Sequence, residues 1–352
     1  MRRVFASDVF KIVVYVLSAL LTGALLAPWL YRAGKWLAAT TDGRAKGLVP
    51  WLAAACGRSE FPRYFDRALM LAALVLLLPA LRWLRAGRGG RKFRDTPWSL
   101  RLPDAEVALD EGQPLRRNPH GWRQLGFGFL LAAGSLLLLG WGLIHAGAFV
   151  WRDAATSLRG GENVMPLEKI RWFKAMKHAL PPAVIVAVIE EILFRGVLFG
   201  MLLRVLRPVS ALVVLSLMFA SLHFLDSPLG MKVAEPGGAT AGMWLLGQIV
   251  TRFTEPLPML AEFSTLVAVG LVLAYARWRT ASLWLSIGLH AGWVFGILWF
   301  KALTWPVFGL AGARSWWIGH NLSEGLAPLA VVLATGAVVH FLTRRDAARI
   351  SN

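Results

Sequence analysis

The sequence contains a single cysteine, Cys56, among its 352 residues. An internal disulfide needs two cysteines, and a cysteine-based structural zinc site needs several. The cysteine content therefore excludes a disulfide framework and a multi-cysteine metal centre.

Charge is also scarce, and acidic charge most of all. Only 16% of the residues are charged, with 20 Asp and Glu against 38 Lys and Arg. By contrast, 57% are hydrophobic, and the mean hydropathy is +0.55. These values are typical of a polytopic membrane protein.

The net charge of +18 would indicate a nucleic-acid-binding protein if the chain were soluble. Here the basic residues gather at the ends of apolar runs, where they contact anionic lipid and set the orientation in the bilayer. We therefore expect the lipid bilayer as a partner, and no nucleic acid.

Several apolar runs are long enough to cross a hydrocarbon core of about 30 Å. They lie near residues 10–31, 66–84, 125–150, 180–203, 208–225, 258–276, 281–300 and 325–343. The sequence therefore predicts an all-α, polytopic membrane helix bundle with about eight transmembrane helices. The stretch 241–250 is too short to span alone, so we expect an interfacial or re-entrant helix there.

Orientation follows from the distribution of Lys and Arg. The basic 82–124 loop and the Arg344-Arg345 tail predict that the N-terminus and the C-terminus are both cytoplasmic. The first apolar run is too long for a signal-peptide core, which predicts a retained first span. The composition is that of a bacterial chain, so the expected location is a bacterial cell membrane, crossed several times.

Ionisable residues divide the chain into two parts. The first three runs carry none in their central thirds, and His145 lies near the end of the third run. The 82–124 segment has the glycine, proline and charge of a surface linker. We predict an accessory transmembrane module over residues 1–165 and a second domain over 166–352, which holds the polar residues that could do chemistry, with its motifs between 181 and 295.

The segment 188–200, VIEEILFRGVLFG, places two carboxylates and an arginine inside an apolar helix. An uncompensated charge there costs roughly 2.5–3.5 kcal/mol, which indicates a polar interior or a partner. Arg195 lies one helical turn after Glu191, so the two can pair. Glu190 then remains able to change its protonation state, as a general base must. Alternatively, all three charges only hold helices together.

Two histidines lie on later spans. His223 follows Phe219 by one turn, and His290 follows Ser286 by one turn within a stretch of small residues that permits close helix approach. A lone histidine in a membrane helix is more often a buried hydrogen-bond donor than a functional group. Two carboxylates and two histidines on three spans can nevertheless converge on one cavity.

These residues fit three motifs in order. Residues 190–195 fit E-E-x-x-x-R, residues 219–223 fit F-x-x-x-H, and His290 begins the third motif. With these gaps, residues 181–295 resemble the CAAX protease and bacteriocin-processing (CPBP) family of intramembrane glutamic proteases, which includes the Ras-converting CAAX endopeptidase.

The resemblance implies a membrane-embedded glutamic endopeptidase that cleaves a membrane-associated protein or peptide without a cofactor or metal. By the resemblance, Glu190 would activate the attacking water, His223 would hold or polarise it, and His290 would stabilise the oxyanion. Glu191 would orient its neighbours and pair with Arg195. These five residues are the expected catalytic set.

The sequence departs from the family at Val294, where the third motif usually has Asn or Asp. A valine cannot donate a hydrogen bond to an oxyanion. Ser286, one turn before His290, is a candidate substitute donor. Alternatively, the Ser286 hydroxyl bonds a carbonyl one turn back in its own helix.

Three other functions compete with this interpretation. Carboxylates and histidines are also zinc ligands, so a zinc-dependent membrane protease is one alternative. Adjacent glutamates diverge by about 100° on a helix, and H-E-x-x-H spacing is absent, which argues against it. The others are a non-catalytic scaffold or immunity protein of the same family and a proton-linked transporter, although no inverted repeat is evident.

Overall fold

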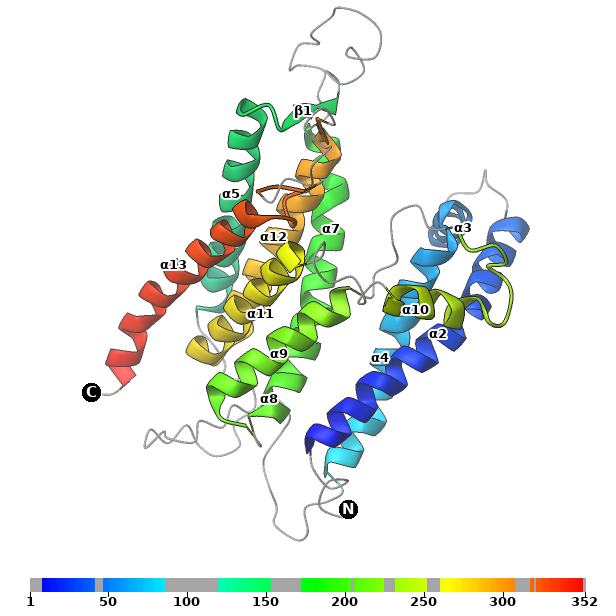
Figure 1. The fold of residues 1–352 in the computed structure, drawn as a ribbon, viewed down its shortest axis with the longest axis horizontal. Helices are drawn as coiled ribbons and strands as arrows, with labels where there is room; N and C mark the ends of the chain where they lie inside the picture. Colours follow the sequence, from blue (N-terminus) through cyan, green and yellow to red (C-terminus); the bar gives the residue numbers. More distant parts are fainter. Residues whose placement is uncertain are drawn as a thin grey trace, which may run out of the picture. The chain divides into compact units, whose positions relative to one another are not determined.

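The computed structural model describes residues 8–41, 47–85, 120–152, 172–203, 206–224, 232–251, 260–307, 317–319 and 321–350. Helices dominate these residues (Figure 1). Their bounds are α2 Asp8–Thr40, α3 Leu48–Arg58, α4 Phe61–Arg85, α5 Gly121–His145, α7 Trp172–Glu191, η3 Ile192–Leu198, α8 Phe199–Leu202, α9 Pro208–His223, α10 Ala241–Thr251, α11 Leu260–Thr280, α12 Trp284–Leu303 and α13 Leu326–Ile350. Two short strands, β1 (Phe149–Trp151) and β2 (Thr304–Pro306), pair antiparallel. The predicted all-α membrane bundle is confirmed.

Each predicted apolar run overlaps helical structure among the described residues, and the run 125–150 extends past the end of α5 into β1. Within the described residues, five helices are long and apolar enough to cross a membrane: Phe10–Thr40, Gly121–His145, Leu260–Thr280, Trp284–Leu303 and Leu326–Thr343. The apolar helices α9 and α10 are shorter. The number of about eight spans therefore stays a prediction.

The chain forms two compact units, one comprising residues 1–92 and 221–257, the other 93–220 and 258–352. These units divide the chain after residues 92, 220 and 257. The predicted division at residue 165 therefore stays a prediction. The third predicted span, α5, belongs to the second unit and packs along α12.

In the first unit, α2 packs along α4, and α10 packs on α2. Gly242 of α10 approaches the carbonyl of Ala24 so closely that a Cβ atom there would lie 1.9 Å from the oxygen. Phe65 and Leu245, both fully buried, belong to the apolar core between these helices. The 241–250 stretch is therefore a helix, and its predicted interfacial or re-entrant position stays a prediction.

In the second unit, glycines bring α12 against α5. Gly288 and Gly292 are four residues apart, hence on one face. A Cβ atom would lie 2.2 Å from the Leu125 carbonyl oxygen at Gly288 and 2.5 Å from the Phe129 carbonyl oxygen at Gly292. This backbone contact is the small-residue packing that joins membrane helices. His290 lies between the two glycines, two residues from each, so its side chain is on the opposite face of α12 and points away from α5.

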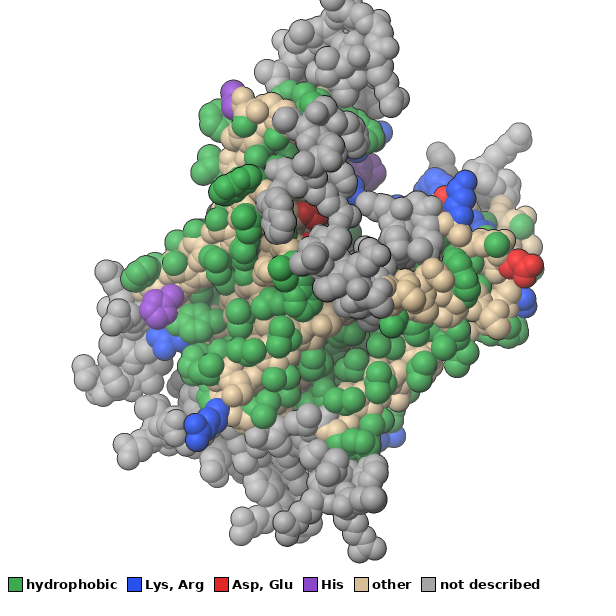
Figure 2. Space-filling view, in the orientation of Figure 1, with side chains coloured by type: hydrophobic (Ala, Val, Ile, Leu, Met, Phe, Trp, Pro, Cys, Tyr) green, Lys and Arg blue, Asp and Glu red, His purple; other side chains and the backbone are tan. Residues whose placement is uncertain are grey.

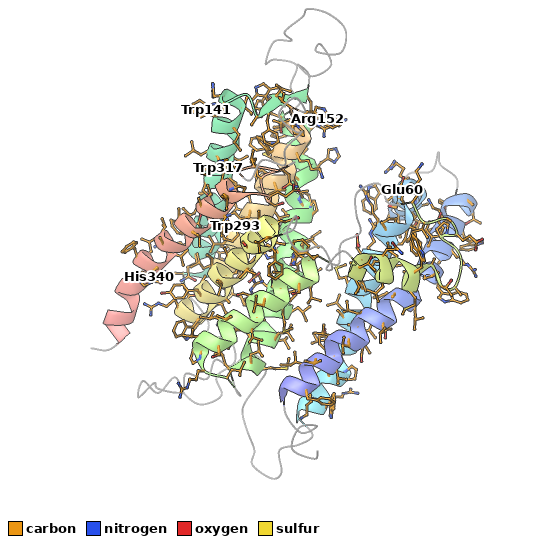
Figure 3. All side chains as sticks on the ribbon, viewed as in Figure 1. Glu60, Trp141, Arg152, Trp293, Trp317 and His340 are labelled. Atoms are coloured by element: carbon orange, nitrogen blue, oxygen red, sulfur yellow. The ribbon has the colours of Figure 1, made fainter. Side chains whose placement is uncertain are left out.

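The helix flanks carry the apolar side chains expected of lipid-facing surfaces. Figure 2 shows hydrophobic side chains over most of the visible described surface. Trp122 and Trp141, exposed by 75% and 57%, lie near opposite ends of α5, and Figure 3 labels Trp141 at the end near β1. Their 19-residue separation corresponds to about 28 Å. Tryptophans at this separation are typical of the two membrane interfaces.

Candidate active site

The glutamates lie where the α7 helix changes its winding. Glu190 and Glu191 are its last residues, and a π-helical segment, η3, follows from Ile192 to Leu198. Single π-helical turns inside helices are rare and frequently occur at functional sites. Arg195 lies within η3 and is fully buried. The junction of α7 and η3 therefore places Glu190, Glu191 and Arg195 within two helical turns.

A stripe of small residues leads to Glu191. The buried residues of α7 are spaced four apart and are Ala175, Ala179, Ala183, Ala187 and Glu191. Residues four apart share a helix face, and small side chains let a second helix approach. Ala179 and Ala183 pack with Phe295 of α12. The same face then presents the Glu191 carboxylate to α12.

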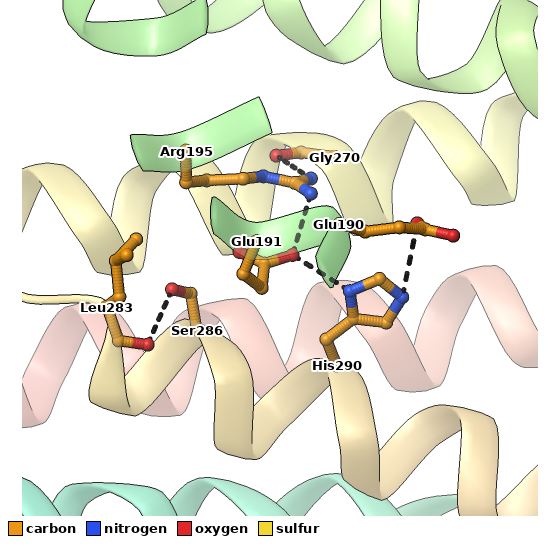
Figure 4. A network of polar contacts seen from close by, with 7 residues as sticks. All are labelled: Glu190, Glu191, Arg195, Gly270, Leu283, Ser286 and His290. Carbon is orange, nitrogen blue, oxygen red and sulfur yellow. Dashed lines mark hydrogen bonds and ion pairs between the residues drawn. The ribbon is translucent and has the colours of Figure 1, made fainter. Parts of the chain in front are cut away.

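Glu191 is held by two donors on one oxygen. Arg195 donates from Nη1 to Oε1 at 2.7 Å, and both side chains are 0% exposed. His290 Nδ1 lies 2.8 Å from the same oxygen (Figure 4). A carboxylate only accepts hydrogen bonds, so the ring nitrogen donates. The predicted Glu191–Arg195 pair is present, and His290 joins it.

Arg195 also contacts two other helices of the second unit, α11 and α9. Its Nη2 donates to the carbonyl of Gly270 in α11 at 3.4 Å. Its guanidinium carbon lies 4.4 Å from the centroid of the Phe219 ring in α9, a cation–π distance. The Phe219 ring also meets the His290 ring edge-on, with centroids 6.0 Å apart. Phe219 thus contacts both groups that hold Glu191.

Glu190 lies at the accessible side of this cluster. Its Oε2 is 3.8 Å from His290 Nε2, and its side chain is 25% exposed against 5% for His290. The cluster therefore runs from the fully buried pair Glu191 and Arg195 through His290 to Glu190, whose side chain is partly exposed although its Oε2 atom is buried.

The structure brings together Glu190, Glu191, Arg195 and His290 (Figure 4). The fifth predicted residue, His223, ends α9 one turn after Phe219. It falls in the other compact unit, so its part in the site stays a prediction. The Gly270 carbonyl was missed, because no sequence pattern marks a backbone acceptor on another helix.

The departure at Val294 has a structural setting. Val294 packs against an apolar cluster that includes Ala179 and Ala183, so its surroundings are hydrocarbon. Ser286, proposed above as a substitute donor, donates to the carbonyl of Leu283 at 3.0 Å. The alternative interpretation of Ser286, a bond within its own helix, is the one the structure contains.

The described residues contain no ready metal site. No group of three or more His, Cys, Asp or Glu side chains there is arranged to hold a metal ion. The zinc-dependent alternative stays a hypothesis that chelation tests.

Comparison with known proteins identifies the segment that carries this cluster. Residues 172–296 match the family model described as type II CAAX prenyl endopeptidase Rce1-like. The match spans α7 to the middle of α12, about a third of the chain, and includes all five predicted residues. No curated protein and no solved structure matches the chain. The family resemblance is confirmed for these residues, and it indicates a CAAX-protease-type endopeptidase in the membrane.

Proposed function

We propose that this chain, whose residues 172–296 form the Rce1-like segment, is an intramembrane glutamic endopeptidase that cleaves a membrane-associated protein or peptide. The observation that carries the proposal is the position of His290 between two carboxylates. Its Nδ1 is 2.8 Å from Glu191, and its Nε2 is 3.8 Å from Glu190.

The two glutamates have different tasks in this proposal. Glu191 is fully buried and bonded to Arg195 and His290, so it stays a fixed anion that orients the imidazole ring. Glu190 is partly exposed and faces the other ring nitrogen. It is therefore the carboxylate that exchanges a proton with a bound water.

The charges of the cluster support this assignment. Two carboxylates and one guanidinium leave one negative charge, and buried charge is costly unless it is balanced. In the proposal, His290 carries a proton on each ring nitrogen, which makes the four groups neutral together and leaves Glu190 as a carboxylate. The cluster then contains both a base and a donor without any further ion.

The proposed reaction takes place at the pair formed by Glu190 and His290. The distance of 3.8 Å exceeds a hydrogen bond, and a water placed beside both groups can bond to each. Glu190 accepts a proton from the water, whose oxygen bonds to the scissile carbonyl carbon. The carbonyl electrons move to oxygen, and His290 Nε2–H donates to that oxyanion. The C–N bond then breaks as Glu190 returns the proton to the leaving amine. His223 is assigned to holding the water, by the family resemblance.

The depth of the site favours a membrane-associated substrate. Trp284, at the start of α12, contacts the exposed Trp122 with ring centroids 4.8 Å apart. His290 lies six residues further along α12, about 9 Å deeper. A peptide must therefore enter the hydrocarbon region to reach Glu190, which a membrane-anchored or transmembrane segment does.

Comparative proteomics of membranes tests the proposal. Cells carrying Glu190→Gln should accumulate an uncut membrane precursor that wild-type cells cleave. Glu60→Gln, the same chemical change at an exposed glutamate outside the cluster, is the matched control and should leave processing unchanged. Identical membrane peptides in wild type and Glu190→Gln would contradict the proposal.

One observation favours a second candidate, a non-catalytic scaffold of the same family. Val294 packs against alanines and offers no donor beside His290, so the oxyanion would have one histidine instead of two donors there. In the scaffold case, the partner protein stays intact in wild-type membranes and is lost from the purified complex on Glu190→Gln.

A further inference from the structure

The second oxygen of Glu191 lacks the support that the first receives. Arg195 and His290 both bond to Oε1, whereas Oε2 is buried without a hydrogen-bond partner among the described residues. A buried carboxylate oxygen without a donor is energetically costly, and it leaves the carboxylate able to rotate about its last bond. A donor close to Oε2 would remove both problems.

Ser286 is in position to be that donor. It is fully buried and precedes His290 by one turn, so both side chains lie on the face of α12 that meets α7. Figure 4 shows Ser286 beside the Glu191 carboxylate, on the side away from Glu190. This placement also separates Ser286 from the space where an oxyanion would form, so it does not replace the missing donor at Val294.

The carbonyl of Leu283, which accepts the Ser286 hydroxyl, already has another donor. The Leu283 carbonyl accepts the Ser286 hydroxyl at 3.0 Å, but it already accepts the amide of Ile287 at 2.8 Å. Ser286 Oγ and Glu191 Oε2 are not hydrogen-bonded in this structure, so the Glu191 carboxylate must turn about its last bond while the hydroxyl hydrogen rotates about the Cβ–Oγ bond. Glu191 Oε2 is charged and unsatisfied, whereas the carbonyl keeps its helical bond.

We propose that Ser286 is a positioning residue whose hydroxyl donates to Glu191 Oε2 and fixes the carboxylate plane. Oε1 is then held towards both Arg195 Nη1 and His290 Nδ1, and the His290 ring keeps Nε2 towards Glu190. Ser286 acts through Glu191 and does not touch the substrate. The catalytic consequence rests on the proposed endopeptidase function, whereas the contact itself does not.

The contact is tested first, without any substrate. In a double-mutant cycle of thermal unfolding in detergent, Ser286→Ala should lower Tm by a few degrees in the wild-type background and by clearly less in Glu191→Gln. Where Glu191→Gln fails to fold, the background is Glu191→Gln with Arg195→Gln, which removes both charges. Additive effects of the two changes would overturn the contact, whatever the protein does.

Ser135→Ala is the matched control. The Ser135 hydroxyl also donates to a carbonyl three residues back, that of Ala132, at 3.0 Å, and it lies on α5, away from Glu191. Its effect on Tm should be the same in both backgrounds. A cycle in which Ser135→Ala couples to Glu191 as strongly as Ser286→Ala would also overturn the proposal.

The catalytic consequence is tested second, on the precursor found in membranes. Ser286→Ala should lower kcat about 10-fold with little change in KM, because the substrate does not contact Ser286. Ser286→Thr, which keeps the hydroxyl, should restore most of kcat, and Ser135→Ala should leave it unchanged. Coupling in Tm with an unchanged kcat would overturn the positioning role. Absence of cleavage by the wild type would instead overturn the proposed function and leave the contact standing.

Discussion

Glu191 and His290 are 99 positions apart in the sequence, and Oε1 of the first lies 2.8 Å from Nδ1 of the second. This bond joins α7 to α12 where Arg195 also reaches Glu191. It fixes the imidazole so that its other nitrogen faces Glu190. The orientation of the proposed reacting groups therefore depends on the contact between α7 and α12.

Glu190→Gln should abolish turnover and leave the fold intact. The amide keeps the shape of the side chain but cannot accept a proton from water, and general-base contributions are typically of order 10²–10⁴-fold. Glu190 is 25% exposed, so the change removes no fully buried ion pair. Rates on the identified substrate and Tm in detergent measure the two effects. Retention of more than about a tenth of wild-type activity contradicts the assignment of Glu190 as base.

Arg195→Ala should destabilise the protein strongly. It leaves Glu191 as an uncompensated, fully buried charge and removes the bond to the Gly270 carbonyl, and such changes cost about 3–5 kcal/mol. The double variant Glu191→Gln with Arg195→Gln should unfold at a higher temperature than Arg195→Ala, because both charges are gone. Arg152→Ala, at an exposed arginine near β2, is the control. Equal Tm losses for the single and the double variant would show that the pair does not stabilise the fold.

The local part of the site followed from spacing in the sequence. Residues four apart on a helix share a face, so the Glu191–Arg195 pair and the grouping of Ser286 with His290 were predictable. The apolar runs likewise predicted where helices lie, because a membrane span needs about 20 apolar residues. Local rules of this kind do not depend on which helices become neighbours.

The long-range part could not be predicted in the same way. Nothing in residues 192–198 marks a π-helix, since the sequence has neither proline nor an inserted polar residue other than Arg195. The glycines at 288 and 292 predicted a close approach, but their partner is α5, a helix whose own sequence carries no charged residue in its centre. Which backbone a glycine meets depends on the packing of the whole unit.

Metal chelation should leave activity unchanged. The bond between Glu191 Oε1 and His290 Nδ1 takes up two possible ligand atoms, and the proposed chemistry uses protons and a water without a Lewis acid. Wild-type protein treated with EDTA or 1,10-phenanthroline should cleave the substrate at the untreated rate. A zinc protease in the same detergent serves as the control for chelator access. Loss of activity that added zinc reverses would favour the zinc-dependent alternative.

Two glycines of α12 provide a matched pair for the helix contact. A Cβ atom at Gly288 would lie 2.2 Å from the Leu125 carbonyl oxygen, whereas one at Gly296 would lie 3.4 Å from the Leu136 Cβ atom. The first distance requires the backbones to separate, and the second is an ordinary van der Waals contact. Alanine is also a better helix former than glycine, by about 1 kcal/mol. Both variants gain this helix propensity, and only Gly288→Ala also forces α12 away from α5.

Gly288→Ala should therefore lower Tm by several degrees, because overpacking typically costs 1–3 kcal/mol. It should also slow cleavage, since Gly288 precedes His290 by two residues and any shift of α12 from α5 moves His290 relative to Glu191. Gly296→Ala should leave Tm and the rate unchanged or raise Tm slightly. Thermal unfolding and single-turnover rates measured on both variants separate these outcomes. Equal behaviour of the two variants would mean that the α5–α12 contact does not set the position of His290, and the dependence of the site on that contact would have to be abandoned.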